Sequence, residues 1–186
     1  MVFTLLAWIG IGILALIAII FFSYFNRFVI LGNRIDNSLS QIDVQLKRRA
    51  DLIPNLVESV KGYMKHEKAA IKAVTDARKA LVSAGNLEGR VKADKQLESA
   101  LKTIFALAEN YPDLKANTNF LELQRELTTT EDKIAYSRQY YNDSILSYNN
   151  LCKTFPGVFF AKIFGKKPRE YLQITEAERE KPKVEF

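Results

Sequence analysis

The pattern of apolar and polar positions divides the chain into an apolar start and a long helical remainder. Residues 2–22 are apolar or nearly so throughout, and the first charged side chain is Arg27. As a helix, these 21 residues would rise about 31 Å, the thickness of one bilayer core. The run predicts a single-pass membrane anchor over residues 1–25.

A cleaved signal peptide is the alternative for this run, but it would need a basic start, a shorter apolar stretch and a small-residue cleavage site. Trp8, Tyr24 and Phe25 suit the two membrane interfaces. Basic residues follow the run and none precedes it. This asymmetry predicts a protein of the cell (inner) membrane with its C-terminal body in the cytoplasm.

Beyond the anchor, apolar residues recur at alternating steps of four and three from Ile35 to Leu81, and only Arg49 and Glu67 interrupt them. This spacing is typical of a coiled-coil seam. It predicts one long helix from about residue 26 to 83, continuous with the anchor. Gly85 then offers a left-handed cap.

The rest of the chain also predicts helices and no strands. A second helix is expected over 87–110, a third from an Asn cap near 117–119 to about 155, and a short fourth within 158–165. The predicted fold is all-α: an elongated antiparallel bundle over 26–167, with three long helices and a short fourth. Residues 168–186 are predicted to form a polar C-terminal tail, of which 176–186 is expected to be loosely held.

Pro54 lies inside the predicted long helix, where a proline removes one hydrogen bond and crowds the residue four positions back. It falls on the side facing away from the seam, and that residue is the small Ala50. We expect the missing bond to open the solvent side and to curve the helix around its partners. A plain bend without functional meaning is the simpler interpretation.

The first helix is predicted to be about twice as long as the second, which leaves its membrane-proximal seam without a partner in the chain. An apolar stripe of this width has to be buried. The hypothesis is therefore self-association of copies into a homo-oligomer, through these residues: Ile35, Leu39, Ile42, Leu46, Arg49, Leu52, Ile53, Leu56 and Val57. A break near Pro54 that folds the chain back on itself is the alternative.

Arg49 is costly at a seam position unless a carboxylate pairs with it. Glu67 is eighteen residues away and out of reach along a straight helix. A carboxylate from the third helix or from a neighbouring chain is expected, unless Arg49 extends to water.

The segment after the third helix combines aromatic and basic residues. It either caps the open end of the bundle, which we favour, or dips into the membrane interface. The residues concerned are Phe155, Pro156, Phe159, Phe160, Ile163 and Phe164.

Several stretches together resemble the LemA family of bacterial membrane proteins. They are QIDVQLKRRADLIPNLVESVKGYMKHE at 41–67, AVTDAR at 73–78, LQRELTTTEDKIAYSRQYYNDSILSYN at 123–149, FPG at 155–157 and the terminal PKVEF. The resemblance covers nearly all of the chain after the anchor. It departs at Ala50, where relatives often have an aromatic residue, and in a variable tail.

The resemblance implies a membrane helix followed by an elongated antiparallel bundle. It marks Arg48, Arg49, Asp51, Pro54 and Asn55 as family hallmarks. No enzymatic activity is established for the family, and some relatives act in shaping or organising membrane compartments. The implied function is a membrane-anchored scaffold, and the alternative is an adaptor that recruits or regulates a membrane enzyme such as a protease or signalling protein.

The residues themselves offer little catalytic chemistry. His66 has no second histidine at metal-ligand spacing, and Cys152 has no neighbouring base, so we expect no metal, no cofactor and no enzyme. The net charge of +6 suits anionic lipid headgroups. It is spread evenly, which argues against nucleic acid as a partner. The expected partners are the lipid bilayer, further copies of the chain and an unidentified membrane protein.

Overall fold

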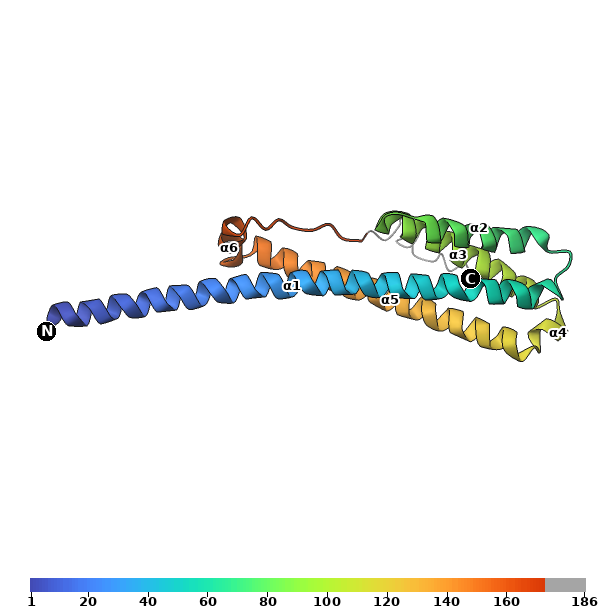
Figure 1. Ribbon diagram of the computed structural model, residues 1–186, viewed down its shortest axis with the longest axis horizontal. Coiled ribbons are helices and arrows are strands. Elements are labelled where there is room, and N and C mark those ends of the chain that lie inside the picture. Colours follow the sequence, from blue (N-terminus) through green and yellow to red (C-terminus); the bar gives the residue numbers. More distant parts are fainter. Residues whose placement is uncertain (173–186) are drawn as a thin grey trace, which may run out of the picture. The chain divides into compact units, whose positions relative to one another are not determined.

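The computed structural model describes residues 1–172, and all regular elements in that range are helices. They are α1 Val2–Lys61, α2 Lys68–Ser83, α3 Leu87–Ala108, α4 Pro112–Lys115, α5 Thr118–Lys153 and α6 Gly157–Ile163 (Figure 1). The predicted all-α class is confirmed. Of the predicted tail, residues 173–186 lie outside the described range.

The prediction of one helix over 26–83 is wrong, because α1 ends at Lys61 and a turn over 62–67 separates it from α2. The turn contains Met64, which is completely buried. Glu67, one of the two interruptions of the apolar spacing, is the N-cap residue of α2. The apolar spacing itself continues past Glu67 to Leu81, so it did not reveal the break.

The chain divides into two compact units. We call residues 1–38 together with 139 onward the terminal unit, and Leu39–Arg138 the central unit. Both α1 and α5 begin in one unit and end in the other as unbroken helices.

In the central unit, α2 folds back along α1 and α3 runs out again beside it. Three contacts fix this order: Arg78 with Ala50, Arg90 with Asp43, and Tyr111 with Glu67. The first segment of α5 returns antiparallel to α1, since Tyr63 contacts Asn117 while Arg48 contacts Glu126. The extra hairpin of α2 and α3 therefore supplies the cover that a single long helix would have lacked.

The terminal unit has a core of its own, formed by α1, α5 and α6. Its buried members are Phe28, Leu31, Ile35, Ile145, Tyr148, Leu151, Cys152 and Ala161. Gly157 is required at the start of α6, because a Cβ there would lie 2.2 Å from the carbonyl oxygen of Leu151. Aromatic side chains on α6 complete the core from one side.

The described start of the polar tail, residues 168–172, is held against α5, and the stretch expected to be loosely held, 176–186, lies outside the described residues. The Asn149 side chain exchanges two hydrogen bonds with the backbone of Arg169, both at 2.8 Å. Asn142 does the same with Leu172, at 3.0 and 3.2 Å. The Arg169 guanidinium also pairs with Asp36 at 3.0 Å.

Of the two helix ends for which a capping residue was predicted, the start of α5 is confirmed and the end of α2 is wrong. Asn117 caps α5 as expected, since its side-chain oxygen accepts a hydrogen bond from the Phe120 N–H at 3.1 Å. Gly85 does not cap α2 in a left-handed conformation, because the chain leaves that helix through an extended Ala84. Among the described residues, the glycine with positive φ is Gly165, after α6.

Candidate functional site

The seam that was expected to face other copies is buried inside one copy. Six of its nine residues are at most 3 % exposed: Ile35, Ile42, Leu46, Arg49, Ile53 and Leu56. Leu39, Leu52 and Val57 are partly buried. The premise that this face lacks a partner within the chain is therefore wrong.

The physical reason is the turn over 62–67. It returns the chain twice along α1, so that α2 and α3 cover positions that a helix folding back only at residue 85 would not reach. Self-association itself is not tested by this burial. It can no longer use this seam, because exposing these side chains would require the bundle to open.

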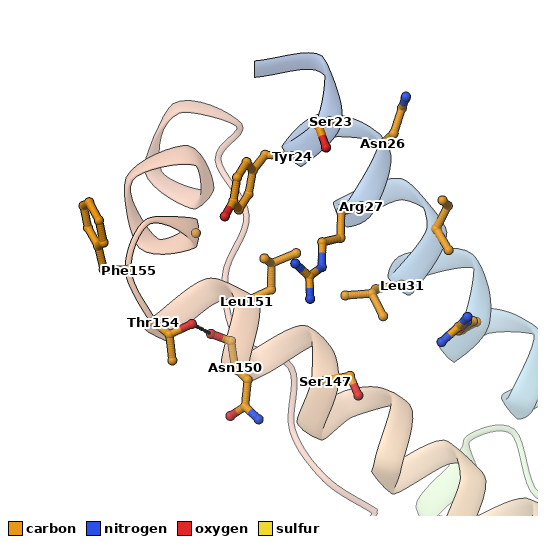
Figure 2. A pocket seen from close by; sticks show the side chains of 13 residues that line it. Ser23, Tyr24, Asn26, Arg27, Leu31, Ser147, Asn150, Leu151, Thr154 and Phe155 are labelled. Carbon is orange, nitrogen blue, oxygen red and sulfur yellow. Dashed lines mark hydrogen bonds between the residues drawn. The ribbon is translucent and has the colours of Figure 1, made fainter. Parts of the chain in front are cut away.

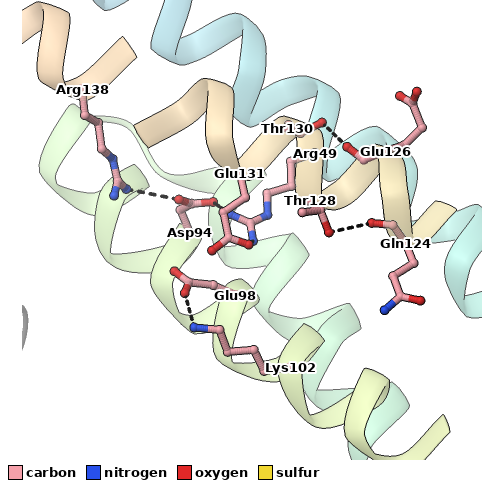
Figure 3. Close-up of polar contacts among 10 residues, drawn as sticks. All are labelled: Arg49, Asp94, Glu98, Lys102, Gln124, Glu126, Thr128, Thr130, Glu131 and Arg138. Atoms are coloured by element: carbon pink, nitrogen blue, oxygen red, sulfur yellow. Dashed lines mark hydrogen bonds and ion pairs between the residues drawn. The ribbon is translucent and has the colours of Figure 1, made fainter. Parts of the chain in front are cut away.

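Arg49 lies at the centre of a buried charge network in the central unit (Figure 3). Its guanidinium pairs with Asp94 of α3 at 3.0 Å and with Glu131 of α5 at 3.6 Å. The Asp94 carboxylate also accepts a hydrogen bond from Arg138 at 3.1 Å. The expected carboxylate from the third predicted helix is present as Glu131. The closer partner, Asp94, comes from the second predicted helix, which sequence reasoning missed.

Burial dominates the electrostatics of this network. It raises the pKa of Asp94, against the opposing charges of Arg49 and Arg138. It also raises the pKa of Glu131, and the neighbouring charge of Glu98 adds to that rise. For Glu98 burial acts in the same direction, but the hydrogen bond and charge of Lys102 outweigh it and lower the pKa. The pKa values of Asp94 and Glu131 are thus raised, and that of Glu98 is lowered.

Pro54 has a specific consequence for the contact between α1 and α2. A proline has no N–H, so the carbonyl of Ala50, four residues back, loses its helical donor. In the structure, Nε of Arg78 on α2 donates to the Ala50 oxygen at 2.8 Å. The Ala50 carbonyl therefore faces α2. The sequence had led us to expect it to face solvent, and the Pro54 side chain itself is exposed.

The aromatic segment after α5 is partly packed against the terminal unit and partly exposed. Phe160 stacks on Tyr24 at 4.5 Å between ring centroids, and Phe164 packs edge-on against Phe21 at 5.1 Å. These two cover the core of the terminal unit. The remaining large apolar residues of the segment are exposed: Phe155 by 88 %, Phe159 by 61 % and Ile163 by 52 %.

Within residues 1–172, α1 is the one helix long and apolar enough to cross a membrane. No part of its most apolar window is buried against the rest of the chain. A core helix of a water-soluble protein would bury such a stretch, so the first part of α1 is a candidate membrane span.

Comparison with known proteins decides the family. The sequence model of the LemA family matches residues 38–186, which is most of the chain. The chain belongs to the LemA family. This confirms the resemblance and, with the exposed apolar stretch of α1, indicates a membrane protein.

Relatives within the LemA group carry two kinds of name. "Magnetosome protein MamQ" of Magnetospirillum gryphiswaldense is 26 % identical over 192 residues, covering 88 % of this chain and 71 % of the relative. "Protein LemA" of Metamycoplasma hominis is 29 % identical over 124 residues, covering 66 % of this chain and 57 % of the relative. Neither name describes a reaction.

The other LemA hallmark residues lie near the surface of α1. Arg48 pairs with Glu126 of α5 at 2.5 Å, and Asp51 pairs with Lys47 at 3.0 Å. The Asn55 side chain is exposed. Of this set, Arg49 forms buried ion pairs, and Pro54 frees the Ala50 carbonyl for Arg78. Asp94, Glu131 and Arg78, which complete these contacts, lie outside the hallmark stretch.

The two side chains considered for catalysis are placed as structural residues. Cys152 is buried in the terminal core, and burial raises the pKa of its thiol, which disfavours the reactive thiolate. His66 is exposed in the turn before α2. Within residues 1–172, no group of three or more His, Cys, Asp and Glu side chains could hold a metal ion.

Proposed function

We propose that this LemA-family chain is a non-enzymatic, membrane-anchored scaffold that self-associates at the surface of the cell (inner) membrane, with its body on the cytoplasmic side. The single observation that carries the proposal is the division of α1. Its first third is apolar and exposed, and the same unbroken helix continues into a segment whose apolar side chains are buried in the bundle. Such a helix fastens a folded body directly to a bilayer.

Charged side chains of the central unit connect one helix to another, which supports a structural role for the protein. Arg49 joins α1 to α3 and α5, and Arg78 joins α2 to α1. These contacts hold neighbouring helices together, because both terminal nitrogens of Arg49 and the Nε of Arg78 have partners on another helix. A polar network of this kind specifies one arrangement of helices.

Self-association now has to use surfaces other than the seam. Large apolar side chains remain exposed on the outer faces of the central unit, including Val44 of α1 by 61 % and Tyr136 of α5 by 68 %. Aromatic residues are enriched where protein surfaces meet. These two positions are therefore the first to test.

Light scattering of the full chain in mild detergent measures the number of copies in one particle. We expect a protein mass that is a multiple of 21.2 kDa, and a return to one copy when Val44→Ser and Tyr136→Ser are combined. Val82→Ser, at an equally exposed position of α2, is the matched control and should leave the size unchanged.

A single copy in detergent would overturn the self-associating scaffold and favour the adaptor that recruits or regulates a membrane enzyme. The burial of six of the nine seam residues within one chain is the observation that speaks for this second candidate. Protease treatment of intact cells tests the orientation, because a cytoplasmic body should stay uncut until the cells are opened.

A further inference from the structure

A polar pocket of about 730 Å³ opens in the terminal unit directly after the apolar run of α1. Figure 2 shows its two walls, one from α1 and one from the end of α5. The α1 wall carries Ser23, Arg27 and Arg34, and the α5 wall carries Asn150 and Thr154. Two guanidinium groups and no carboxylate line this pocket, so it favours an anion.

The spacing along α1 explains why these side chains share a wall. Arg27 lies four residues after Ser23, and Arg34 lies two turns after Arg27, which puts all three on one face of the helix. Leu31 lies between the two arginines on the same face and is buried, which holds that face against α5.

Neither arginine is paired within the described chain. No hydrogen bond or ion pair joins the guanidinium group of Arg27 or Arg34 to another residue of 1–172, whereas the arginine side chains of the central unit at 48, 49, 78, 90 and 138 all donate to protein acceptors. In Figure 2 the Arg27 guanidinium points from α1 toward the α5 wall. Its donors are therefore available to a ligand.

The position of the pocket along the chain identifies the source of the anion. If residues 2–22 span the bilayer core, the next turn, from Ser23 to Arg27, rises about 6 Å through the headgroup layer. A phosphate at this depth belongs to a lipid. Described residues of the terminal unit also carry seven Lys and Arg against three Asp and Glu, which attracts anionic lipids.

We propose that this pocket binds the phosphate ester of an anionic phospholipid headgroup. The two guanidinium groups pair with the phosphate oxygens from α1. Guanidinium is suited to this because its fork of N–H groups matches two oxygens of one phosphate. The proposal rests on the membrane anchoring of the proposed function and does not depend on self-association.

Native mass spectrometry of the full chain in mild detergent, with added phosphatidylglycerol or phosphatidylcholine, tests this binding. We expect one phosphatidylglycerol retained per chain, with about tenfold preference over phosphatidylcholine, as a charge-assisted pair of contacts gives. Combined Arg27→Gln and Arg34→Gln should abolish the preference. The pair Lys166→Gln and Lys167→Gln, which removes the same charge at exposed residues outside the pocket, should keep it.

Equal losses in the two double variants would overturn the proposal, because diffuse attraction does not distinguish the positions of charges. Combined Arg27→Lys and Arg34→Lys keeps the charge but not the fork, and unchanged preference in this variant would also contradict the proposal. Circular dichroism checks that each variant folds, which we expect because both arginines are exposed.

Inorganic phosphate added at millimolar concentration separates the two sources of the anion. Retention of phosphatidylglycerol in its presence supports a headgroup site, and displacement of the lipid by phosphate at equal concentration overturns it. Lipid retention and particle size are separate readouts of one spectrum. Failure of this proposal can therefore be distinguished from failure of the scaffold.

Discussion

The two units of this LemA-family chain bury different kinds of side chain. The terminal unit packs aromatic rings, with Phe28 against Tyr148 at 5.8 Å and against Phe164 at 6.0 Å. The central unit buries the ion pair of Arg49 and Asp94, each 2 % exposed. Among the described residues, no charged side chain is buried in the terminal unit.

This difference shows how each unit specifies one packing of its helices. Rings exclude water and fill volume, so their stabilisation follows area and shape and is insensitive to pH and salt. A buried ion pair barely repays its desolvation, but losing one partner is costly, so it penalises every arrangement that separates the two. The central unit should therefore be the more sensitive to charge, and the terminal unit to volume.

The largest expected effect comes from removing a ring in the terminal unit. Phe28→Ala should lower the free energy of unfolding by about 3–5 kcal/mol, because Phe28 is 2 % exposed and the ring leaves a cavity. Urea unfolding of the full chain in mild detergent measures this loss. Val29→Ala, at the exposed neighbouring position, should stay within about 0.5 kcal/mol, and similar losses for both would mean that the aromatic core is not well packed.

Removing the Arg49 guanidinium should lower the free energy of unfolding somewhat less than removing the Phe28 ring. Arg49→Met leaves Asp94 with Arg138 as its remaining partner, and we expect a loss of about 3 kcal/mol, measured in the same way. Arg48→Met, at the exposed neighbour, should cost less than about 1 kcal/mol. Adding Asp94→Leu to Arg49→Met should restore most of the stability. If it does not, the cost lies in packing and not in the unpaired charge.

The contact between Pro54 and Arg78 should give a smaller, conditional effect. Arg78→Met leaves the Ala50 carbonyl without a donor and should cost about 1–3 kcal/mol. In a Pro54→Ala background a backbone N–H is restored at position 54, so the same change should cost about 1–2 kcal/mol less. A double-mutant cycle of unfolding free energies measures this coupling, and additive losses would contradict the role given to Arg78.

The smallest effect concerns pH in the central unit. The pKa of Glu131 is raised above its ordinary 4.5, mainly by burial and further by the charge of Glu98. The native state thus holds this proton more tightly than the unfolded state. The stability that results is fully present below pH 4.5 and is lost as the pH rises through the native pKa.

Glu131→Gln should remove that decline, and melting temperatures measured from pH 4 upward would show a flatter profile for the variant. The effect is small because the Glu131 side chain is 43 % exposed. Glu122→Gln, at an exposed position of the same helix, is the control and should follow the unchanged chain. A profile equally steep in all three proteins would show that Glu131 does not contribute to it.

Most of the helices could be predicted from local pattern. The apolar run of residues 2–22, the start of α5 at an Asn cap and the buried spacing from Ile35 to Val60 are all properties of neighbouring residues along one helix. The sequence also predicted a carboxylate beside Arg49, because a buried guanidinium needs an opposite charge whatever the path of the chain. The family, too, followed from sequence.

What only the tertiary structure decided is which segments meet. The turn over 62–67 depends on Met64 being buried against the rest of the central unit, and a local pattern cannot weigh that packing against a continued helix. Asp94 and Arg78 lie far apart in sequence from their partners, and the two walls of the polar pocket are equally distant along the chain. Their meeting depends on where the chain reverses, because helix periodicity sets the face of a residue and only packing sets its neighbour.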